Sequence, residues 1–237
     1  MKFTVISWAL ISLHVAMGQS PVGATTPPPV ADSLPSSSIA QVVDRYHDFM
    51  HNQELVYNGV AFVNYSPGIT GTAFWRDSLV KKGSVLYDKV WYRGVSLLYD
   101  IVADKLIISD RYQNYLYPVP EKVEQFAIDG HTFIRTPKGY CDVLCTGPIG
   151  IQARRIKSIQ EISSVQDFSI EMVEGDHFYM VKGTTYVELW GVKSLLSQLG
   201  DKKNAVRKYL RKNNISLRKN KELAMVTAAE YYNRLSR

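Results

Sequence analysis

The sequence predicts a mainly β protein of the α+β class. We expect an antiparallel β-meander, either a barrel or a sandwich, with one N-terminal helix and a C-terminal helical subdomain. Between residues 57 and 190, short apolar or alternating runs recur at intervals of about ten residues, with turn residues between them. No long helical pattern interrupts these runs, which excludes parallel βαβ folds. Before and after this region the apolar spacing becomes helical.

The first residues predict a secretory signal peptide. Lys2 supplies a positive charge, Phe3–Met17 is an apolar run, and Ala16-Met17-Gly18 has the small-x-small pattern of a cleavage site, so residues 1–18 are removed. No lipobox cysteine follows the run, and no later run reaches the ~18 apolar residues of a membrane span. We therefore expect a secreted or periplasmic protein without a transmembrane span after cleavage.

Residues 19–37 are rich in Pro, Ser, Thr and Ala, which predicts a flexible or polyproline-like spacer. Ser38–Gln41 matches a capping box and opens a helix that we expect to end near Asn52. Its apolar residues form one stripe that should pack on the β body: Ile39, Val42, Val43, Tyr46, Phe49 and Met50. Together with the strands, this helix makes a predicted domain over residues 38–190.

The stretch Tyr87–Ile108 is the centre of the predicted meander. It reads as two or three antiparallel strands, with turns at Arg93-Gly94 and Ala103-Asp104. Other expected turns are marked by glycine next to a polar residue or proline, including Asn58-Gly59, Pro67-Gly68, Lys82-Gly83, Asp129-Gly130, Lys138-Gly139, Gly147-Pro148 and Lys182-Gly183.

Residues 191–237 predict three helices that form a basic subdomain packed on the β body. We expect a short helix over Val192–Leu199, a second from Asp201 to about Asn213, and a third over about Lys219–Leu235. The second helix places Val206 and Leu210 on one face and its cations opposite. The third carries only a narrow polar stripe, which indicates extensive packing.

The positive charge is concentrated in this subdomain. Residues 201–221 hold nine Lys or Arg and one acid, a net charge of +8, whereas residues 20–200 hold sixteen basic and nineteen acidic residues, a net charge of −3. Such a segment is either the solvated face of packed helices or a contact for an anionic envelope surface or an acidic partner protein. No nucleic-acid motif is present, so we expect no nucleic-acid partner. The candidate contact residues are Arg207, Lys208, Arg211, Lys212, Arg218 and Lys219.

Candidate catalytic and metal-binding residues are few. His47 and His51 have the spacing of a helical zinc site, but both fall on the polar side of the expected helix, and we interpret them as surface residues. Three aspartates could cluster as an acid/base pair or a calcium site, but turn-capping is the commoner role: Asp88, Asp100 and Asp104. We therefore expect no catalytic residue, metal or cofactor.

Two histidines and two cysteines complete the set of reactive side chains. His131 and His177 lie beside predicted turns, and we expect both on the exposed surface. Cys141 and Cys145 would lie ~13 Å apart on a straight strand, too far for a disulfide unless a bulge or turn intervenes. The simplest interpretation is that they are two small buried apolar residues.

Several glycine and aromatic positions resemble a known family. They include Tyr57-Asn58-Gly59, the run from Gly83 to Tyr99-Asp100, Phe126…Gly130…Phe133, Gly139-Tyr140…Leu144…Gly147 and Tyr231-Tyr232-Asn233. Together they resemble a family of uncharacterised secreted or periplasmic proteins of Bacteroidota-type bacteria over residues 55–235. The resemblance implies a bacterial envelope setting and no particular reaction.

These observations predict an envelope-associated protein with a non-enzymatic role in binding or scaffolding. A hydrolase acting on envelope material is the first alternative, because catalytic side chains on neighbouring strands leave no contiguous motif. A ligand-carrying β-barrel is the second, and it would show a large interior cavity.

Overall fold

The computed structural model describes residues 41–42, 45–46, 55–163, 168–217 and 219–236. The chain divides into two compact units, residues 1–39 and 40–237, and the described residues all belong to the second. The predicted signal peptide and spacer therefore lie outside the described residues. So does most of the predicted N-terminal helix, of which only Gln41-Val42 and Arg45-Tyr46 are described; these are helical and exposed.

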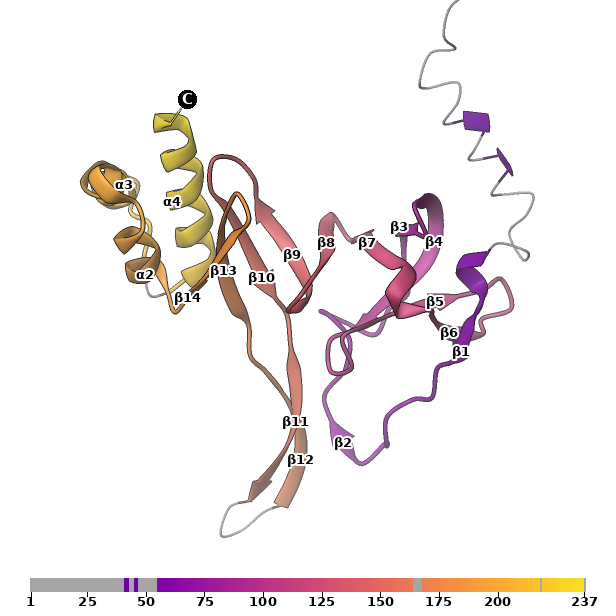
Figure 1. Ribbon diagram of the computed structural model, residues 1–237. Helices are drawn as coiled ribbons and strands as arrows, with labels where there is room; N and C mark the ends of the chain where they lie inside the picture. The colour runs from indigo at the N-terminus through magenta and orange to yellow at the C-terminus, as the bar shows by residue number, and fades with distance from the viewer. Residues whose placement is uncertain (1–40, 43–44, 47–54, 164–167, 218, 237) are drawn as a thin grey trace, which may run out of the picture. The chain divides into compact units, whose positions relative to one another are not determined.

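One large antiparallel sheet organises the second unit, in the strand order β1-β6-β5-β4-β3-β7-β8-β9-β10-β13-β14 (Figure 1). This confirms that the protein is mainly β. The strands of this sheet are β1 (Gly59–Ala61), β3 (Lys81–Tyr87), β4 (Val90–Asp100), β5 (Lys105–Ser109), β6 (Tyr115–Pro118), β7 (Val123–Ile128), β8 (His131–Thr136), β9 (Gly139–Cys145), β10 (Gly150–Arg154), β13 (His177–Lys182) and β14 (Thr185–Leu189).

Of the two architectures left open by the sequence, barrel or sandwich, the described residues do not form a closed barrel. After β3 the chain adds β4, β5 and β6 in turn on one side of β3. It then passes through the short 3-10 helix η2 (Pro120–Lys122) and places β7 on the other side of β3. All later strands of the sheet are added outward from β7. A sheet that grows from its middle in both directions keeps two edges, and in the described residues β1 and β14 form these edges without pairing to each other.

Two of the predicted turns lie inside strands instead. Arg93-Gly94 belongs to β4, which runs unbroken from Val90 to Asp100, and Lys82-Gly83 belongs to β3. The register between these strands shifts at Gly83, opposite Gly94, whose φ is +67°. The glycines therefore mark a β-bulge, which bends the strands without ending them. The predicted turns at Ala103-Asp104 and Asp129-Gly130 are confirmed.

An aromatic core packs against the first part of the sheet. Phe126 and Phe133 stack with ring centroids 4.9 Å apart, and Tyr99 lies 5.1 and 4.9 Å from these two rings. Tyr140 packs edge-on against Phe126 at 5.2 Å. Because these residues come from β4, β7, β8 and β9, the aromatic cluster fixes the packing of the central strands.

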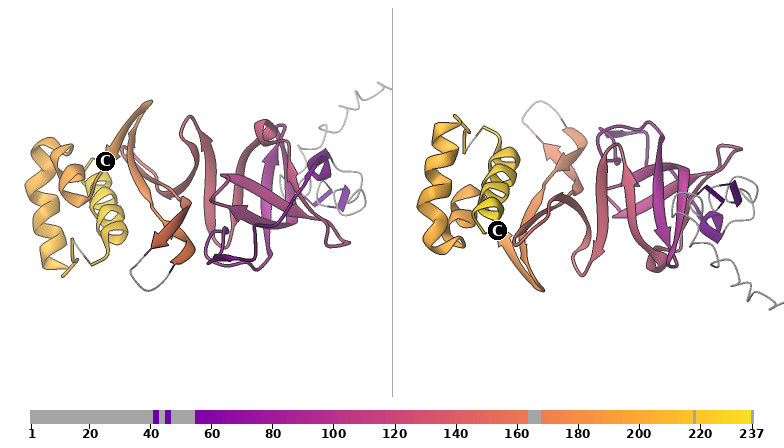
Figure 2. Two further views of the ribbon diagram at one scale, coloured as in Figure 1. Left: turned by 90° about the horizontal axis from the view of Figure 1, so that it is seen from below. Right: turned by 90° about the horizontal axis from the view of Figure 1, so that it is seen from above.

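Three C-terminal helices lie at the other end of the sheet, two of them packed on its strands and the third packed on those two helices (Figure 2). They are α2 (Val192–Ser197), α3 (Lys203–Lys212) and α4 (Lys221–Leu235), with η3 (Gly200–Lys202) before α3. The fully buried Met225, Ala228 and Ala229 of α4 pack with Ile151 and Met180 of the sheet in a second core. Small residues on α4 allow the helix to approach the strands closely. No helix in the described part of the chain is both long and apolar enough to cross a membrane.

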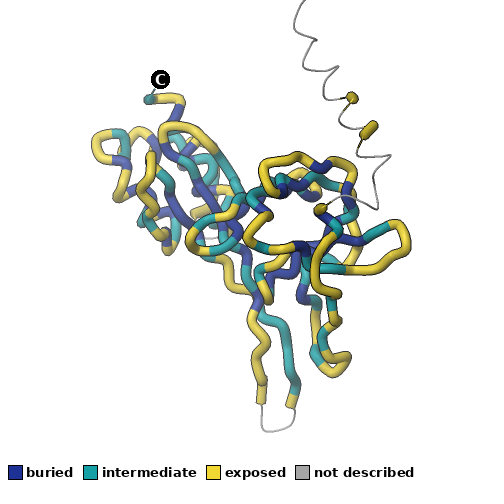
Figure 3. The backbone as a smooth tube through the Cα atoms, turned by 45° about the vertical axis from the view of Figure 1, so that its right-hand side comes forward, coloured by how far each residue is buried: buried dark blue, intermediate teal, exposed yellow. Residues whose placement is uncertain are grey.

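A second, three-stranded sheet extends from the large one. Strands β11 (Lys157–Ser163) and β12 (Phe168–Glu174) form a hairpin, and β2 (Ile69–Thr70) pairs with β12 in parallel. Nearly all of its residues are exposed or half-buried (Figure 3). Lys157 at its base is buried, and its ammonium group donates to the carbonyls of Thr72 and Phe74 at 2.9 and 3.0 Å, which fastens the ribbon to the loop before β3.

Candidate functional site

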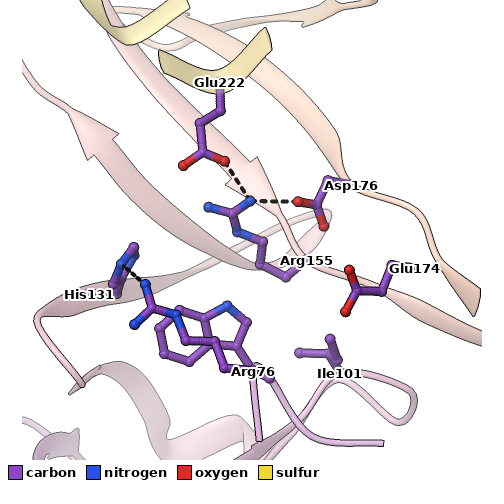
Figure 4. Close-up of a pocket in the computed structure, with 8 residues that line it drawn as sticks. Arg76, Ile101, His131, Arg155, Glu174, Asp176 and Glu222 are labelled. Atoms are coloured by element: carbon purple, nitrogen blue, oxygen red, sulfur yellow. Dashed lines mark hydrogen bonds and ion pairs between the residues drawn. The ribbon is translucent and has the colours of Figure 1, made fainter. Parts of the chain in front are cut away.

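A polar cleft of about 270 Å³ lies where segments distant in sequence meet (Figure 4). Its walls come from the loop before β3, the β4–β5 turn, β8, the ends of β10 and β12, and the first turn of α4. The lining carries two guanidinium groups and three carboxylates beside an imidazole and an indole. The lining residues are Trp75, Arg76, Ile101, His131, Arg155, Glu174, Asp176 and Glu222.

Arg155 is the centre of the charged network on the cleft wall. Its Nε and Nη2 donate to the carboxylate of Asp142 at 3.2 and 2.7 Å, and its Nη1 donates to Asp176 and Glu222 at 2.5 and 2.8 Å. Burial alone would lower the pKa of Arg155, but the hydrogen bonds to these three carboxylates outweigh it and raise the pKa. One guanidinium group therefore links β9, the start of β13 and the first turn of α4.

Asp142 also orients His131. The Nδ1 atom of His131 lies 2.9 Å from an oxygen of this fully buried carboxylate, and Nη2 of Arg76 lies 2.9 Å from Nε2. A guanidinium group can only donate, so Nε2 is the acceptor and the proton of the neutral ring lies on Nδ1. His131 thus resembles a base held by a buried carboxylate, but the nitrogen that would take a proton from a substrate is occupied by Arg76.

Arg76 is itself held on several sides. Its backbone adopts a left-handed conformation with φ +64°, its guanidinium group forms an ion pair with Asp129 at 2.5 Å, and it lies 4.5 Å from the centre of the Trp75 ring. The Trp75 ring contacts the ring of His131 edge-on at 4.8 Å. A non-glycine residue in the left-handed region is strained, and these contacts on the loop compensate for that strain.

The cleft is built chiefly as an ion-pair network. Asp142, Asp176 and Glu222 each have an oxygen bound to Arg155, and both ring nitrogens of His131 have partners. A ligand would compete with these internal contacts for every strong polar group. Within the described residues, no group of three or more His, Cys, Asp or Glu side chains is arranged to hold a metal ion.

The three aspartates considered in the sequence serve turns and strand ends. Asp88 occupies the β3–β4 turn with φ +50° and forms an ion pair with Lys122 at 2.8 Å. Asp100 accepts hydrogen bonds from the backbone amides of Val102 and Ala103 at 3.0 and 2.9 Å, which is the expected turn chemistry.

Asp100 does more than close a turn. Its carboxylate is fully buried and also accepts the hydroxyl groups of Tyr65 and Tyr117, each at 2.9 Å. Burial, together with the hydrogen bond and the charge of Asp100, raises the pKa of both tyrosines. Asp104 has other partners: it accepts the Tyr99 hydroxyl at 2.6 Å and lies 3.3 Å from the amide of Tyr140.

The candidate contact residues for an anionic surface lie on and after α3. Val206 and Leu210 of this helix are buried, as predicted, while Lys208, Arg211 and Lys212 are exposed and Arg207 is half-buried. Lys219 is exposed in the connection to α4, and the side chain of Arg218 is outside the described residues. Within the described part of the chain, none of Arg207, Lys208, Arg211, Lys212 and Lys219 forms a salt bridge with a carboxylate.

The remaining candidates divide between buried, exposed and undescribed positions. Cys141 and Cys145 lie on β9 as free thiols, and burial raises the pKa of both. His177 is paired with Glu188 at 2.9 Å on the surface, whereas the expectation that His131 is an exposed surface residue is wrong because it lines the cleft. The His47 to His51 segment lies outside the described residues.

The sequence analysis did not predict that Arg155 binds the carboxylates of Asp142, Asp176 and Glu222 at the cleft. The one available signal was a charged residue in the middle of a predicted apolar strand, Asp142 within Tyr140–Leu144. Comparison of the chain with protein-family models, with curated proteins and with solved structures finds no match. The class defined by the fold is an open, mainly antiparallel β protein with a basic helical layer on one end of its sheet.

Proposed function

We propose that this protein is a secreted or periplasmic envelope protein of a bacterium. In this proposal it binds an anionic surface through the basic helical subdomain and does not act as a catalyst. One observation carries the proposal: the cations of α3 are displayed opposite its buried face and, in the described residues, form no salt bridge. Cationic side chains that stabilise the fold have nearby carboxylates, as Arg155 does. Unpaired surface cations instead raise the local concentration of anions and steer anionic partners.

The polar cleft supports the same proposal indirectly. The contacts of Arg155 fix the start of α4 to the sheet, and α4 in turn packs on α3. The cationic face is therefore carried by a helical layer with a fixed attachment. A preorganised set of charges binds an anion with a smaller loss of conformational entropy than the same charges on a flexible tail would.

The test is a binding measurement across a salt series, using the expected mature form from Gln19. The probes are anionic phospholipid vesicles and immobilised heparin, a soluble polyanion. We expect binding to both that weakens as ionic strength rises, because exposed charges are screened within about 10 Å at 0.1 M salt. The triple variant Arg207→Ser, Lys208→Ser, Arg211→Ser should lose most of this binding.

The matched control removes the same amount of charge from the β body. Lys82, Lys138 and Lys182 are exposed and, among the described residues, form no salt bridge, so replacing all three by Ser lowers the net charge equally. The control should keep the binding of the wild type. Equal losses in both variants would mean that only the net charge matters, and no binding by the wild type would reject the proposal.

A second candidate function is hydrolysis of envelope material at the cleft. The observation that favours it is the imidazole of His131 held by the buried Asp142. Because Nε2 accepts from Arg76, a substrate would have to displace that guanidinium group before His131 could act as a base. Product release from envelope polysaccharide or ester substrates that disappears in a His131→Gln variant would favour this function over binding.

A further inference from the structure

A second surface on the helical subdomain is apolar. A groove of about 560 Å³ lies where the end of β14, the start of α2 and the α3–α4 connection meet. The indole of Trp190 is the most prominent part of it, at 79% exposed, and Leu217 on the opposite segment is 36% exposed. The groove is lined by Trp190, Gly191, Val192, Lys193, Ser194, Leu217 and Lys221.

The backbone on both sides of Trp190 is fixed. Leu189 and Val192 are each only 2% exposed, so they anchor the chain in the second core just before and after the indole. Ser194 closes the short connection, because its Oγ donates to the Gly191 carbonyl at 2.7 Å and lies 3.2 Å from the Gly191 amide. Trp190 is therefore presented outward from a rigid segment. A large apolar side chain held in this way commonly marks a binding surface.

The charges around the groove are of one sign. Lys193 and Lys221 line it and no carboxylate does, while Lys219 is exposed close by in the sequence. The ammonium group of Lys221 lies 4.9 Å from the centre of the Phe178 ring, a cation–π contact that holds this charge beside the groove. Leu217 and Lys219 also belong to the segment that directly follows the cationic last turn of α3.

We propose that this groove is where the protein inserts into the interface of an anionic phospholipid bilayer. Trp190 enters the boundary between headgroups and acyl chains, and Lys193 and Lys221 contact the phosphates. Trp favours this boundary because its ring is apolar and its N–H can remain hydrated. Lysines bordering an apolar patch are typical of helices and loops that lie in the interface. This inference rests on the proposed function, in which the α3 cations supply the longer-range attraction.

The combination of cations and exposed apolar residues at the groove favours a bilayer over a soluble polyanion. A polyanion needs only the cations and gains nothing from an exposed indole beside Leu217. A bilayer offers both an anionic layer and an apolar layer, and the groove has a partner for each. Binding should therefore have a salt-sensitive part from α3 and a part from Trp190 that persists at higher salt.

The test uses vesicles of phosphatidylcholine and phosphatidylglycerol whose acyl chains carry bromine, which quenches tryptophan fluorescence on contact. We expect the mature protein to be quenched and a Trp190→Phe variant to lose most of that quenching. A Trp190→Ser variant should bind these vesicles at least about fivefold more weakly while its heparin binding is unchanged, because insertion energy follows the buried apolar area.

Trp91 provides the matched control. It lies on β4 and is 37% exposed, so a Trp91→Phe variant removes a surface indole from the β body. The absolute fluorescence intensity that this variant loses on vesicle binding should equal that lost by the wild type. Quenching that is absent in the wild type, or that persists in Trp190→Phe, would overturn the insertion proposal even if heparin and vesicle binding continue. Loss of binding to both probes would instead reject the proposed function itself.

Discussion

The guanidinium group of Arg155 lies against the carboxylate of Asp142, with Nη2 2.7 Å from Oδ2, although Asp142 has no exposed surface. Two charges this deeply buried are tolerated only because each is hydrogen-bonded by the other and by further groups. Asp142 also binds His131, and Arg155 also binds Asp176 and Glu222. The pair is thus the point at which the sheet, the cleft and α4 are joined.

Replacing Arg155 by Met should strongly destabilise the fold. The change leaves the buried Asp142 without its cation, and removing one partner of a buried pair typically costs about 3–5 kcal/mol. Urea denaturation should show this as a lower midpoint. Arg207 is a half-buried cation of α3 that forms no salt bridge with a described carboxylate, so Arg207→Met should change the free energy of unfolding by less than about 0.5 kcal/mol. Similar stabilities for the two variants would contradict the role given to Arg155.

Asn233 of α4 should be a second position that joins the helix to the sheet. The side-chain Oδ1 of Asn233 accepts a hydrogen bond from the backbone N–H of Ile149 at 2.9 Å, and its Nδ2 donates to the backbone carbonyls of Ile149 and Thr146 at 2.8 and 3.3 Å. Asn233→Ala leaves these buried backbone groups unpaired, which should cost about 2–4 kcal/mol in thermal or chemical unfolding.

Gly147 tests the same contact from the other side. Its φ is +147°, and a Cβ there would lie 2.5 Å from Nδ2 of Asn233. Gly147→Ala should therefore destabilise the wild type by about 2 kcal/mol or more, and by less in an Asn233→Ala background, where the steric conflict is removed. A double-mutant cycle measures this coupling. Additive effects would show that the two residues do not interact.

The Asp100 network should stabilise the packing of β6 and the β1–β2 loop, which carry Tyr117 and Tyr65. Tyr65→Phe and Tyr117→Phe each remove one hydroxyl donor to a buried carboxylate, so each should lower the free energy of unfolding by about 1–2 kcal/mol. Tyr112 is 69% exposed, and Tyr112→Phe is the matched control. If Tyr65→Phe is as stable as the control, the hydrogen bond to Asp100 contributes little.

Tyr140 should make stability fall at alkaline pH. Burial raises its pKa from 10.0 to about 12, against the opposing effect of Arg135. Between pH 10 and about pH 12 the Tyr140 hydroxyl is ionised in the unfolded state but keeps its proton in the folded state. The contribution of Tyr140 to the free energy of unfolding is therefore fully present below pH 10 and is lost as pH rises toward 12. Between pH 9 and pH 11 the wild type should lose about 1 kcal/mol more than Tyr140→Phe in urea titrations.

The sequence predicts the β class, the central meander and the C-terminal helices because these depend on local periodicity. It does not predict that Arg93-Gly94 lies within β4, since a glycine next to a polar residue has the same composition in a turn and in a bulge. Only the pairing of Gly83 and Ser84 with β4 shows that Gly94 lies in a bulge and not in a turn. The open sheet was also beyond prediction, because it depends on which side of β3 receives β7, and this is a long-range choice.

The polar cleft depends even more on long-range contacts. Arg155 binds residues thirteen positions before it and sixty-seven after it, at Asp142 and Glu222. No local spacing connects such residues, so their chemistry is visible only after folding. The cations of α3 were predictable because helical periodicity alone separates Lys208 and Arg211 from the buried Val206 and Leu210.

The parallel pairing of β2 with β12 has a consequence for how the chain matures. Ile69 pairs with Ile170, so the ribbon receives its third strand only after about one hundred further residues have left the ribosome. Contacts of such large sequence separation form slowly, because a long loop must first close. During synthesis, β2 therefore has no strand partner in this sheet until β12 has been made, and we expect completion of the three-stranded sheet to be a late step of folding.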